Sequence, residues 1–301
     1  MSRTLLIGHR GYIGSRLIQE IDADGIDINW FRSGKENIDF KDLSKSYYSE
    51  FDNIILLAGH SSVKMSESNL SSCFHNNVRN FIHLLEKIDN QKLIYASSSS
   101  VYGSVGGKTV NEKYFGFEPY NQYDISKHVA DLYAQKSDVE YYALRFGTVN
   151  GYSPFLRSDV MINAMVNSAI NDGHIKLYIK DTMRPILGIN DLCRAVRYIL
   201  ASGEDKRGLY NLASFNKTAE QIAYEVADVM GVEVKEFQAD PTQIENTKNQ
   251  TKAYNFSIST LKFRREFGFK FKDTVESLTN ELKSSWGKMK KTNRSESKYY
   301  E

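Results

Sequence analysis

The stretch Leu5-Leu6-Ile7-Gly8-His9-Arg10-Gly11-Tyr12-Ile13-Gly14 decides the fold of this 301-residue chain. A short apolar run ends in glycines at positions 8, 11 and 14, and a helical pattern of apolar residues begins at Ile13. This order predicts a buried strand, a tight turn and a helix whose free N–H groups face the turn. Such a helix end carries about half a positive charge, and the glycines let a pyrophosphate approach the backbone. We therefore expect a dinucleotide site, formed by Gly8, Arg10, Gly11, Tyr12, Ile13 and Gly14.

Composition and charge narrow the possible classes of protein. The chain is 41% hydrophobic and 25% charged, which is ordinary for a globular protein in water. With 39 basic and 37 acidic residues, the net charge of +2 gives no electrostatic case for nucleic acid. No apolar run reaches the roughly 18–20 residues of a membrane span, and Met1–Thr4 lead into the first strand without a signal peptide. We expect a cytoplasmic enzyme without membrane partner or metal, in which Cys73 and Cys193 are reduced thiols.

Strand-like and helix-like patterns alternate to about residue 150, which predicts right-handed crossovers and a parallel sheet. Strands are predicted at 25–31, 51–59, 92–96, 141–146, 174–179 and 209–212, and helices at 123–135, 160–171, 191–201, 218–230, 257–267 and 274–285. The predicted fold class is α/β, a Rossmann-type doubly wound parallel sheet with a smaller, mostly C-terminal α/β substrate-binding lobe. The dinucleotide-binding domain is assigned to 1–150 and 189–213, the substrate lobe to 151–188 and 214–283, and a flexible tail to 284–301.

The end of the second predicted strand bears on the choice between NAD and NADP. In the NAD form of this fold, an acidic residue about 20 residues past the glycines binds the ribose 2′-hydroxyl. This chain offers Phe31-Arg32-Ser33-Gly34-Lys35 there, and Arg32 with Ser33 suits a 2′-phosphate. Arg10 in the glycine turn can join them. We therefore favour NADP(H) slightly over NAD(H), although Arg32 and Lys35 can also be solvated loop charges.

Tyr123-Asp124-Ile125-Ser126-Lys127 places a tyrosine and a lysine at i and i+4, on one face of a helix. A phenol ordinarily ionises near pH 10. A neighbouring ammonium and the positive charge of an oxidised nicotinamide both favour the phenolate, so Tyr123 could exchange a proton near neutral pH. Taken alone, this spacing is common on helices.

Together the motifs resemble the extended short-chain dehydrogenase/reductase family of nucleotide-sugar enzymes, the NAD-dependent epimerases and dehydratases. The resemblance rests on the glycine spacing, the Tyr123/Lys127 pair and four further segments: Leu57-Ala58-Gly59, Asn77-Val78, Ser98-Ser99-Ser100-Val101-Tyr102-Gly103, and Met183–Asp191. It implies a nucleotide-diphosphate sugar as substrate and NAD(P) as cofactor. It also implies a homodimer formed through the helix beginning at Tyr123 and the helix near Val78.

The resemblance assigns roles to individual residues. It implies that Ser98, Tyr123 and Lys127 are catalytic. The further cofactor contacts that it implies are Asp39, Phe40, Leu57, Ala58, Gly59, Phe146, and again Tyr123 and Lys127. The implied substrate contacts are Ser99, Thr148, Arg157, Asn163 and Arg184.

Departures from the family pattern limit the reaction. Family dehydratases carry acidic residues where this chain has Ser99 and Ser100, so dehydration is disfavoured. The epimerising Cys and His of GDP-fucose synthase, which the chain resembles around Arg10 and Arg32, are replaced by Ser100 and roughly Ser153.

Three functions stay open. The first is a 4-ketoreductase or 4-dehydrogenase of a nucleotide-activated sugar, which Arg10 and Arg32 favour because biosynthetic reductions use NADPH. The second is a 4-epimerase with tightly held NAD, which the segment 152–163 favours by resemblance. The third is a regulatory protein that binds the cofactor without catalysis.

Overall fold

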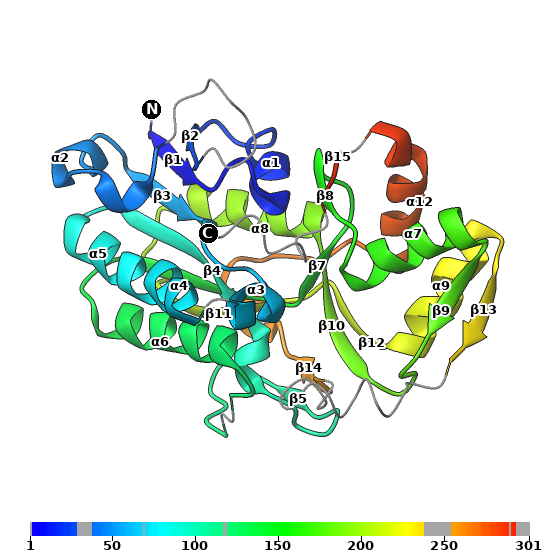
Figure 1. The fold of residues 1–301 in the computed structure, drawn as a ribbon. Helices are drawn as coiled ribbons and strands as arrows, with labels where there is room; N and C mark the ends of the chain where they lie inside the picture. Colours follow the sequence, from blue (N-terminus) through cyan, green and yellow to red (C-terminus); the bar gives the residue numbers. More distant parts are fainter. Residues whose placement is uncertain are drawn as a thin grey trace.

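A six-stranded parallel sheet forms the centre of the computed structural model, which describes residues 2–28, 38–68, 70–116, 119–237, 254–288 and 290–292 (Figure 1). The strand order is β2-β1-β3-β4-β6-β11, and all neighbouring strands are parallel. The strands are β1 (Thr4–Ile7), β2 (Asp24–Ile26), β3 (Asn53–Leu56), β4 (Lys92–Ser98), β6 (Tyr141–Phe146) and β11 (Gly208–Leu212). From β2 the chain crosses back over β1 to β3. This reversal leaves a crevice at the carboxyl ends of β1 and β3, where such sheets bind ligands.

Helices cover both faces of the sheet, as expected for a doubly wound fold (Figure 1). Alternate strand residues point to opposite faces. Leu6 packs with the residues of α1 (Tyr12–Leu17), α8 (Ile189–Ala201) and α11 (Leu261–Glu266). Leu5 and Ile7 pack with those of α5 (Asn80–Lys87) and α6 (Gln122–Lys136). The shorter elements are η1 (Phe40–Asp42), α2 (Lys45–Tyr48), α3 (Val63–Ser68), α4 (Leu70–Phe74), the π-helix η2 (His75–Arg79) and η3 (Ser99–Tyr102).

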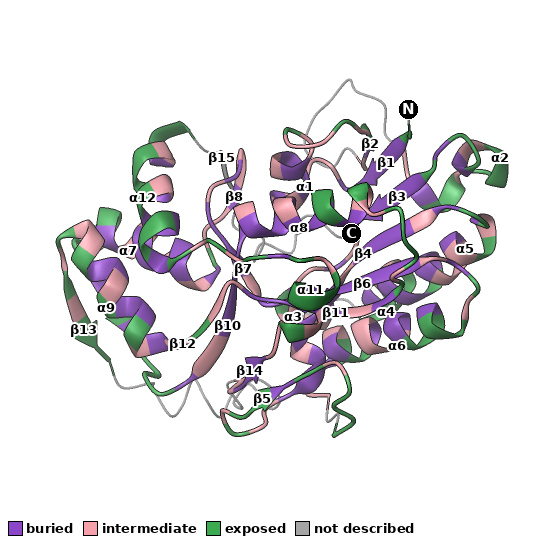
Figure 2. Cartoon of the chain, turned by 180° about the vertical axis from the view of Figure 1, so that it is seen from behind, coloured by how far each residue is buried: buried purple, intermediate pink, exposed green. Residues whose placement is uncertain are grey.

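A second group of elements packs beside the sheet and shares its core. Ile162, Ile222 and Leu278 are fully buried in the same apolar cluster as Leu6, and Figure 2 shows buried residues running across both groups. This group contains α7 (Met161–Asp172), β9 (His174–Leu177), α9 (Ala219–Met230), β13 (Glu233–Glu236) and α12 (Val275–Ser285). A small sheet of β7 (Thr148–Asn150), β10 (Met183–Gly188) and β12 (Phe215–Thr218) joins it to the large sheet. The boundaries of the two predicted domains stay a prediction.

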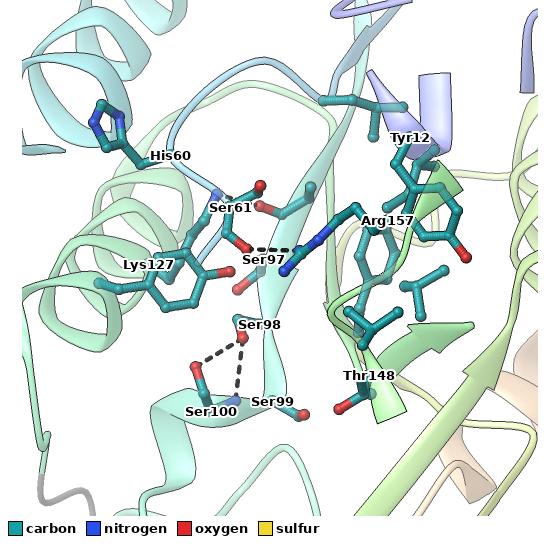
Figure 3. Close-up of a pocket in the computed structure, with 18 of the residues that line it drawn as sticks. Tyr12, His60, Ser61, Ser97, Ser98, Ser99, Ser100, Lys127, Thr148 and Arg157 are labelled. Atoms are coloured by element: carbon teal, nitrogen blue, oxygen red, sulfur yellow. Dashed lines mark hydrogen bonds between the residues drawn. The ribbon is translucent and has the colours of Figure 1, made fainter. Parts of the chain in front are cut away.

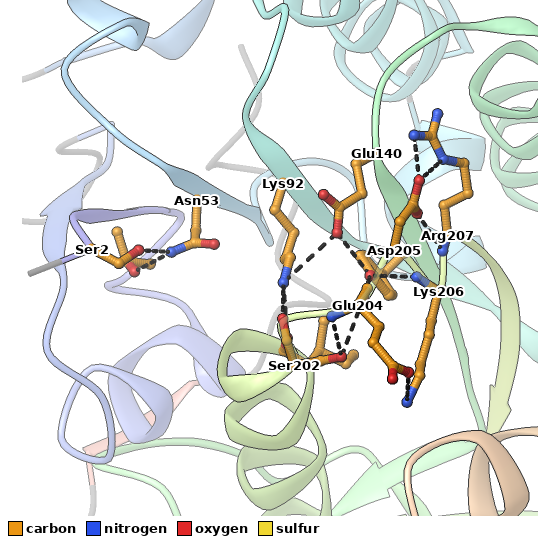
Figure 4. Close-up of polar contacts among 12 residues, drawn as sticks. Ser2, Asn53, Lys92, Glu140, Ser202, Glu204, Asp205, Lys206 and Arg207 are labelled. Carbon is orange, nitrogen blue, oxygen red and sulfur yellow. Dashed lines mark hydrogen bonds and ion pairs between the residues drawn. The ribbon is translucent and has the colours of Figure 1, made fainter.

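The amino ends of the central strands are closed by polar contacts (Figure 4). The Lys92 ammonium donates to the carbonyls of Ile199 and Ser202, at 3.2 and 2.8 Å, and lies 3.7 Å from the Glu140 carboxylate. The Asn53 amide donates to the Ser2 hydroxyl at 2.8 Å. These contacts give Lys92 and Asn53 hydrogen-bond partners at the amino ends of β4 and β3. The crevice lies at the opposite edge of the sheet, at the carboxyl ends of the strands.

Two predicted segments differ from the structure. The helix predicted at 257–267 begins with a strand, β14 (Ser257–Ile258), which pairs with β5 (Thr109–Val110) inside a predicted loop. Only Leu261–Glu266 is helical. The physical reason is tertiary: Ile258 is buried beside Val110, and the Asn216 amide bonds both the N–H and the carbonyl of Ile258.

The predicted tail is also ordered further than expected. Helix α12 continues to Ser285, the 3₁₀ turn η4 (Trp286–Lys288) follows with Trp286 buried, and β15 (Lys290–Thr292) pairs with β8 (Phe155–Arg157). Polar composition suggested a frayed end. Instead, Trp286 joins the apolar cluster, and the backbone of β8 provides hydrogen-bond partners. Within the described ranges, no helix is long and apolar enough to cross a membrane.

Helix α8 is capped by a residue far away in sequence. Its N-cap, Gly188, has no side chain, and the Asp273 carboxylate accepts the N–H of Asp191 at 2.9 Å instead. Asp191 is fully buried and accepts N–H groups of Lys272 and Asp273 in return. Burial, and then the nearby Asp191, raise the pKa of Asp273 to about 6. This carboxylate pair attaches the segment before α12 to the central sheet.

We predict that Asp273→Asn stabilises the protein more strongly near pH 7.5 than near pH 5. Because the pKa of Asp273 is raised, its contribution to stability is fully present below 3.8 and is lost as the pH rises through about 6. Asparagine keeps the cap without that loss, which is on the order of 1–3 kcal/mol. The test is the Tm of both proteins at the two pH values. An equal difference at both would contradict the prediction, and Asp205→Asn, whose pKa Arg207 lowers, is the control with the opposite sign.

Candidate active site

A cavity of about 520 Å³ lies at the carboxyl edge of the sheet, between the glycine turn and the second group of elements. Its walls come from the turn after β1, the ends of β3, β4 and β6, the start of α6, and the segments around residues 157–161, 184–185 and 254–256. Figure 3 shows several of these side chains facing one another across the cavity. Of the predicted site residues, the following line it: Gly8, Gly11, Tyr12, Ile13, Gly14, Leu57, Gly59, Ser98, Ser99, Tyr123, Lys127, Phe146, Thr148, Arg157 and Arg184.

The glycine turn has the close packing that its spacing predicts. A Cβ atom at Gly14 would lie 2.1 Å from the Gly8 carbonyl oxygen, so any other residue would push α1 away from the turn. Gly8 has a φ of +93°, which side chains rarely adopt, and its Cβ would lie 2.6 Å from the Ala58 nitrogen. The bare backbone of this turn forms one wall of the cavity.

Tyr12 fastens the turn to the second group of elements. Its hydroxyl donates to the Gly151 carbonyl at 2.8 Å and accepts from the Asn163 amide at 3.2 Å. The same amide donates to the Arg157 carbonyl at 2.8 Å. Asn163 is fully buried and does not line the cavity, which differs from its predicted substrate contact. Asn163 stabilises the wall of the cavity instead. Its amide oxygen accepts the N–H of Gly151, and its amide nitrogen donates to the Arg157 carbonyl and the Tyr12 hydroxyl.

Helix α6 brings Tyr123 and Lys127 to the cavity beside Ser98. The Asn121 side chain caps the helix by accepting the N–H of Asp124. The Lys127 ammonium donates to the Ala96 carbonyl at 2.9 Å and lies 5.9 Å from the centre of the Tyr123 ring. Ser98 ends β4 and faces the same space (Figure 3). The three residues that the sequence assigns to catalysis therefore lie together.

Burial shapes the proton chemistry of this group. It raises the pKa of Tyr123 to about 12, while a hydrogen bond from Ser98 acts in the lowering direction. It lowers the pKa of Lys127 to about 8, against the raising effect of Asp131. An ionised phenol is thus costly here unless donors and positive charge surround it. Ser98 and Lys127 are the nearby groups that provide both.

Asn77 holds the part of the cavity wall that follows β3. It lies in the π-helix η2, a type of turn that is common at functional sites. Its amide accepts the N–H of His60 at 2.8 Å, and donates to the His60 carbonyl and to the Ser126 hydroxyl. Ser126 in turn donates to the Tyr123 carbonyl. Asn77 therefore couples the end of β3 to the first turn of α6.

Two arginines give the cavity its positive charge. Arg157 donates two hydrogen bonds to the Asp159 carboxylate, at 3.0 and 2.7 Å, and one to the Ser61 carbonyl (Figure 3). Arg184 is different. Its guanidinium donates to the Tyr254 carbonyl at 3.1 Å, and burial lowers its pKa. Within the described ranges no carboxylate pairs with Arg184, so it is the cation better suited to a phosphate.

Several predicted cofactor residues do not line the cavity. Arg32 and Ser33 lie outside the described residues. Arg10 and Ala58 adjoin the turn without lining the cavity, and Phe40 is buried in the core under α5. Asp39 caps η1 by accepting the N–H of Lys41.

The acid expected after the second strand is present, but earlier than the sequence suggests. Strand β2 ends at Ile26, so Asp27 follows it directly, 19 positions after Gly8. Its carboxylate accepts the N–H groups of Arg10 and Ile28, at 2.8 Å each. The predicted strand at 25–31 placed Asp27 inside the strand instead of after it. Asp27 stabilises the glycine turn by accepting the backbone N–H of Arg10.

Sequence reasoning missed other lining residues, among them His60, Ser61, Ser97, Ser100, Asp159, Tyr254 and Phe256. The first four lie at or just after the carboxyl ends of β3 and β4, and the rule that ligands lie at carboxyl ends of strands could have found them. Nothing local marks Tyr254, which is 70 positions from Arg184. Burial and Lys127 lower the pKa of His60 to about 4, which keeps its imidazole neutral.

The residues present suit a dinucleotide. The turn has no side chain where a pyrophosphate would lie, and the Arg10 Nη1 is buried with no hydrogen-bond partner among the described residues. The turn, Leu57, Gly59, Lys127 and Arg184 all line the cavity.

Comparison with known proteins agrees with this geometry. Residues 4–213 match the NAD dependent epimerase/dehydratase family. The chain belongs to this family. Protein CapI of Staphylococcus aureus is 29% identical over 228 residues, which cover 64% of this chain and 68% of CapI. UDP-glucuronate 4-epimerase 3 of Arabidopsis thaliana is 29% identical over 188 residues, 55% of this chain and only 43% of the plant enzyme.

Solved structures of the family have the same fold. The UDP-glucuronic acid 4-epimerase of Bacillus cereus, in complex with UDP-glucuronic acid and NAD, superposes with a TM-score of 0.78. The match covers 93% of this chain and 97% of that one, at 18% identity. The predicted α/β, doubly wound fold and the predicted family are thus confirmed.

We predict that Gly14→Ala abolishes retention of a dinucleotide by the purified protein. Its Cβ would meet the Gly8 carbonyl oxygen at 2.1 Å, and the backbone must shift to relieve the contact. The free energy of unfolding should fall by about 1–3 kcal/mol. Gly203→Ala is the control, because its Cβ meets nothing within 4 Å. Normal dinucleotide binding by Gly14→Ala, measured by calorimetry, would contradict the prediction.

Proposed function

We propose that this chain is a 4-epimerase of a nucleotide-activated sugar that retains NAD. The observation that carries the proposal is the grouping of Tyr123, Ser98 and Lys127 on the wall of the cavity. Among the described lining residues Asp159 is the one with a carboxyl group, and Arg157 occupies both of its oxygens. Water elimination requires further acid/base groups at the sugar. Inversion at C4 needs one proton acceptor that gives the proton back.

The proposed reaction uses the described residues as follows. Tyr123 takes the proton of the sugar 4-hydroxyl and later returns it, while Ser98 donates a hydrogen bond to the same oxygen. Lys127 places a positive charge 5.9 Å from the Tyr123 ring and so favours the ionised phenol. A bound NAD would supply the hydride acceptor for C4 and then the hydride donor to the opposite face of the keto sugar, which has to turn over in the site between the two transfers. Arg184, which no carboxylate of the described part of the chain pairs, suits the diphosphate of the substrate.

The relatives support this proposal over the reductase that the sequence slightly favours. The Arabidopsis relative is named as a 4-epimerase of a UDP-sugar, and the Bacillus cereus structure of the same fold holds NAD. A 4-ketoreductase that uses NADPH stays the second candidate because of one observation. The Arg10 Nη1 beside the glycine turn, which has no hydrogen-bond partner among the residues that the structure describes, is a donor that a 2′-phosphate could accept from.

The experiment that tests the proposal joins cofactor analysis to turnover. We expect purified protein to release NAD on denaturation and to interconvert UDP-sugars that differ at C4. Tyr123→Phe should keep the fold and the cofactor and lose turnover by about 10³-fold or more, because the proton acceptor is gone.

The same experiment separates the alternatives. Protein that carries no cofactor, prefers added NADPH and reduces a 4-keto sugar would replace the epimerase by the reductase. Retained cofactor without turnover of any nucleotide sugar would favour a regulatory protein. A Tyr123→Phe variant with more than about a tenth of the wild-type rate would remove Tyr123 from the mechanism.

We also propose that the chain forms a homodimer through α6 and its neighbour α4, which pack together. These helices carry large apolar side chains that are about half exposed: Leu70, Phe74, Ile125, Leu132 and Tyr133. Ile125 and Leu132 are seven positions apart and share one helix face. An apolar surface of this kind on a globular protein marks an interface.

We predict that Leu132→Glu separates the dimer into monomers, because a carboxylate would lose its hydration at the interface. Light scattering after size-exclusion chromatography measures the mass. Leu261→Glu is the control, since Leu261 is equally exposed but lies on α11, at the other face of the sheet. A monomeric wild type at working concentration would contradict the dimer.

A further inference from the structure

Tyr254 lines the cavity, and the proposed reaction gives it no role. Its main chain lies beside the start of β10. The Arg184 guanidinium donates to the Tyr254 carbonyl at 3.1 Å. The next two residues continue the contact with this strand: Asn255 Oδ1 accepts the N–H of Met183 at 3.0 Å, and the Phe256 N–H donates to the Met183 carbonyl at 3.2 Å. Three hydrogen bonds therefore join residues 254–256 to the strand that carries Arg184.

The side chain of Tyr254 reaches a different element, the first turn of α6. Its hydroxyl donates to Asp124 Oδ2 at 2.7 Å and accepts from the Asn121 amide at 2.6 Å. The same amide donates to Asp124 Oδ2 at 3.1 Å. An amide nitrogen only donates and a carboxylate only accepts, so the single proton of the hydroxyl points to Asp124. The three side chains form a closed set of hydrogen bonds.

This set holds the turn of α6 on which Tyr123 lies. Asn121 is the N-cap of the helix, and its side-chain oxygen accepts the Asp124 N–H at 3.0 Å. Tyr123 lies between these two residues in the chain. Both Asn121 and Asp124 are buried, so water does not readily replace a partner that either of them loses. The Tyr254 hydroxyl is therefore one of the groups that keep Tyr123 in place on the cavity wall.

We infer that Tyr254 is a positioning residue that fixes Tyr123 relative to Arg184, through its hydroxyl on one side and its carbonyl on the other. The inference rests on the proposed function, in which Arg184 binds the diphosphate and Tyr123 meets the sugar 4-hydroxyl. The covalent structure of the substrate limits the distance between these two groups. The hydroxyl reaches Tyr123 only if α6 lies at the matching distance from β10, and a misplacement of about 1 Å can lower the rate about 10²-fold.

Tyr254→Phe separates the two contacts, because it keeps the carbonyl that Arg184 binds and removes the hydroxyl that Asp124 binds. We expect kcat for a UDP-sugar to fall by about 10- to 100-fold. The Kd of UDP, measured by calorimetry, should stay within about twofold of wild type, since the contact of Arg184 is kept.

Tyr48→Phe is the matched control. The Tyr48 hydroxyl is also in the interior and donates at 2.7 Å, to the Phe40 carbonyl, but Tyr48 does not line the cavity. This variant should lower the Tm by about as much as Tyr254→Phe and leave kcat unchanged. An unchanged kcat in Tyr254→Phe would overturn the inference. So would an equal loss of kcat in Tyr48→Phe, or a loss of UDP affinity as large as the loss of kcat.

Asp124→Ala removes the acceptor at the other end of the same hydrogen bond. It should lower kcat at least as much as Tyr254→Phe, and the double variant should lose no more than Asp124→Ala alone. Losses that multiply in the double variant would contradict a shared role. If Asp124→Ala does not fold, Tyr254→Phe and its control carry the kinetic test.

Hydrogen exchange provides a readout that is independent of activity. The amides of Asp124 and Ile125 donate to the side chain and the carbonyl of Asn121. In Tyr254→Phe they should exchange about tenfold faster than in wild type, and in Tyr48→Phe at the wild-type rate. Unchanged exchange in Tyr254→Phe would overturn the inference. If the wild type epimerises no nucleotide sugar, the proposed function fails, and the exchange rates still decide whether Tyr254 holds the first turn of α6.

Discussion

The contact of Gly14 with the Gly8 carbonyl is the constraint on which the site depends. Because neither residue has a side chain in the way, α1 begins directly against the turn that follows β1. That position lets Tyr12 reach Gly151 and Asn163 across the crevice. Asn163 then fixes the backbone of Arg157. A local steric condition at two glycines thus determines how the second group of elements closes one side of the cavity.

Positive charge is distributed unevenly in the cavity. Two arginines and a lysine line it, but their partners differ. Arg157 is neutralised by Asp159, whereas Arg184 has a backbone carbonyl as its hydrogen-bond acceptor. Burial lowers the pKa of Lys127 to about 8. Positive charge is therefore strongest near Arg184, while the space around Tyr123 and Ser98 is lined by hydroxyl groups.

Much of the fold and the catalytic group could be predicted because their signals are local. The strand predicted at 141–146 and the helices predicted at 160–171 and 218–230 follow from short periodic patterns, and the structure has each of them within a residue of those bounds. Where a pattern was weak, tertiary contacts decided the outcome. Residues 257–258 form a strand because β5 and Asn216 bind them there, and the polar segment after residue 284 is ordered by Trp286 and β8.

By itself the sequence determined the class: glycines three apart after a strand, then serine, tyrosine and lysine at the spacing of this family. These depend on chain neighbours, since i and i+4 share a helix face and glycine spacing acts within one turn. Only the tertiary structure decided that Asn163 binds the Arg157 carbonyl and the Tyr12 hydroxyl, that Asp27 binds the N–H of Arg10 and that the Tyr254 hydroxyl binds Asp124. Those contacts join residues separated by up to 151 positions. A repeating pattern in the sequence contains no information about such pairs.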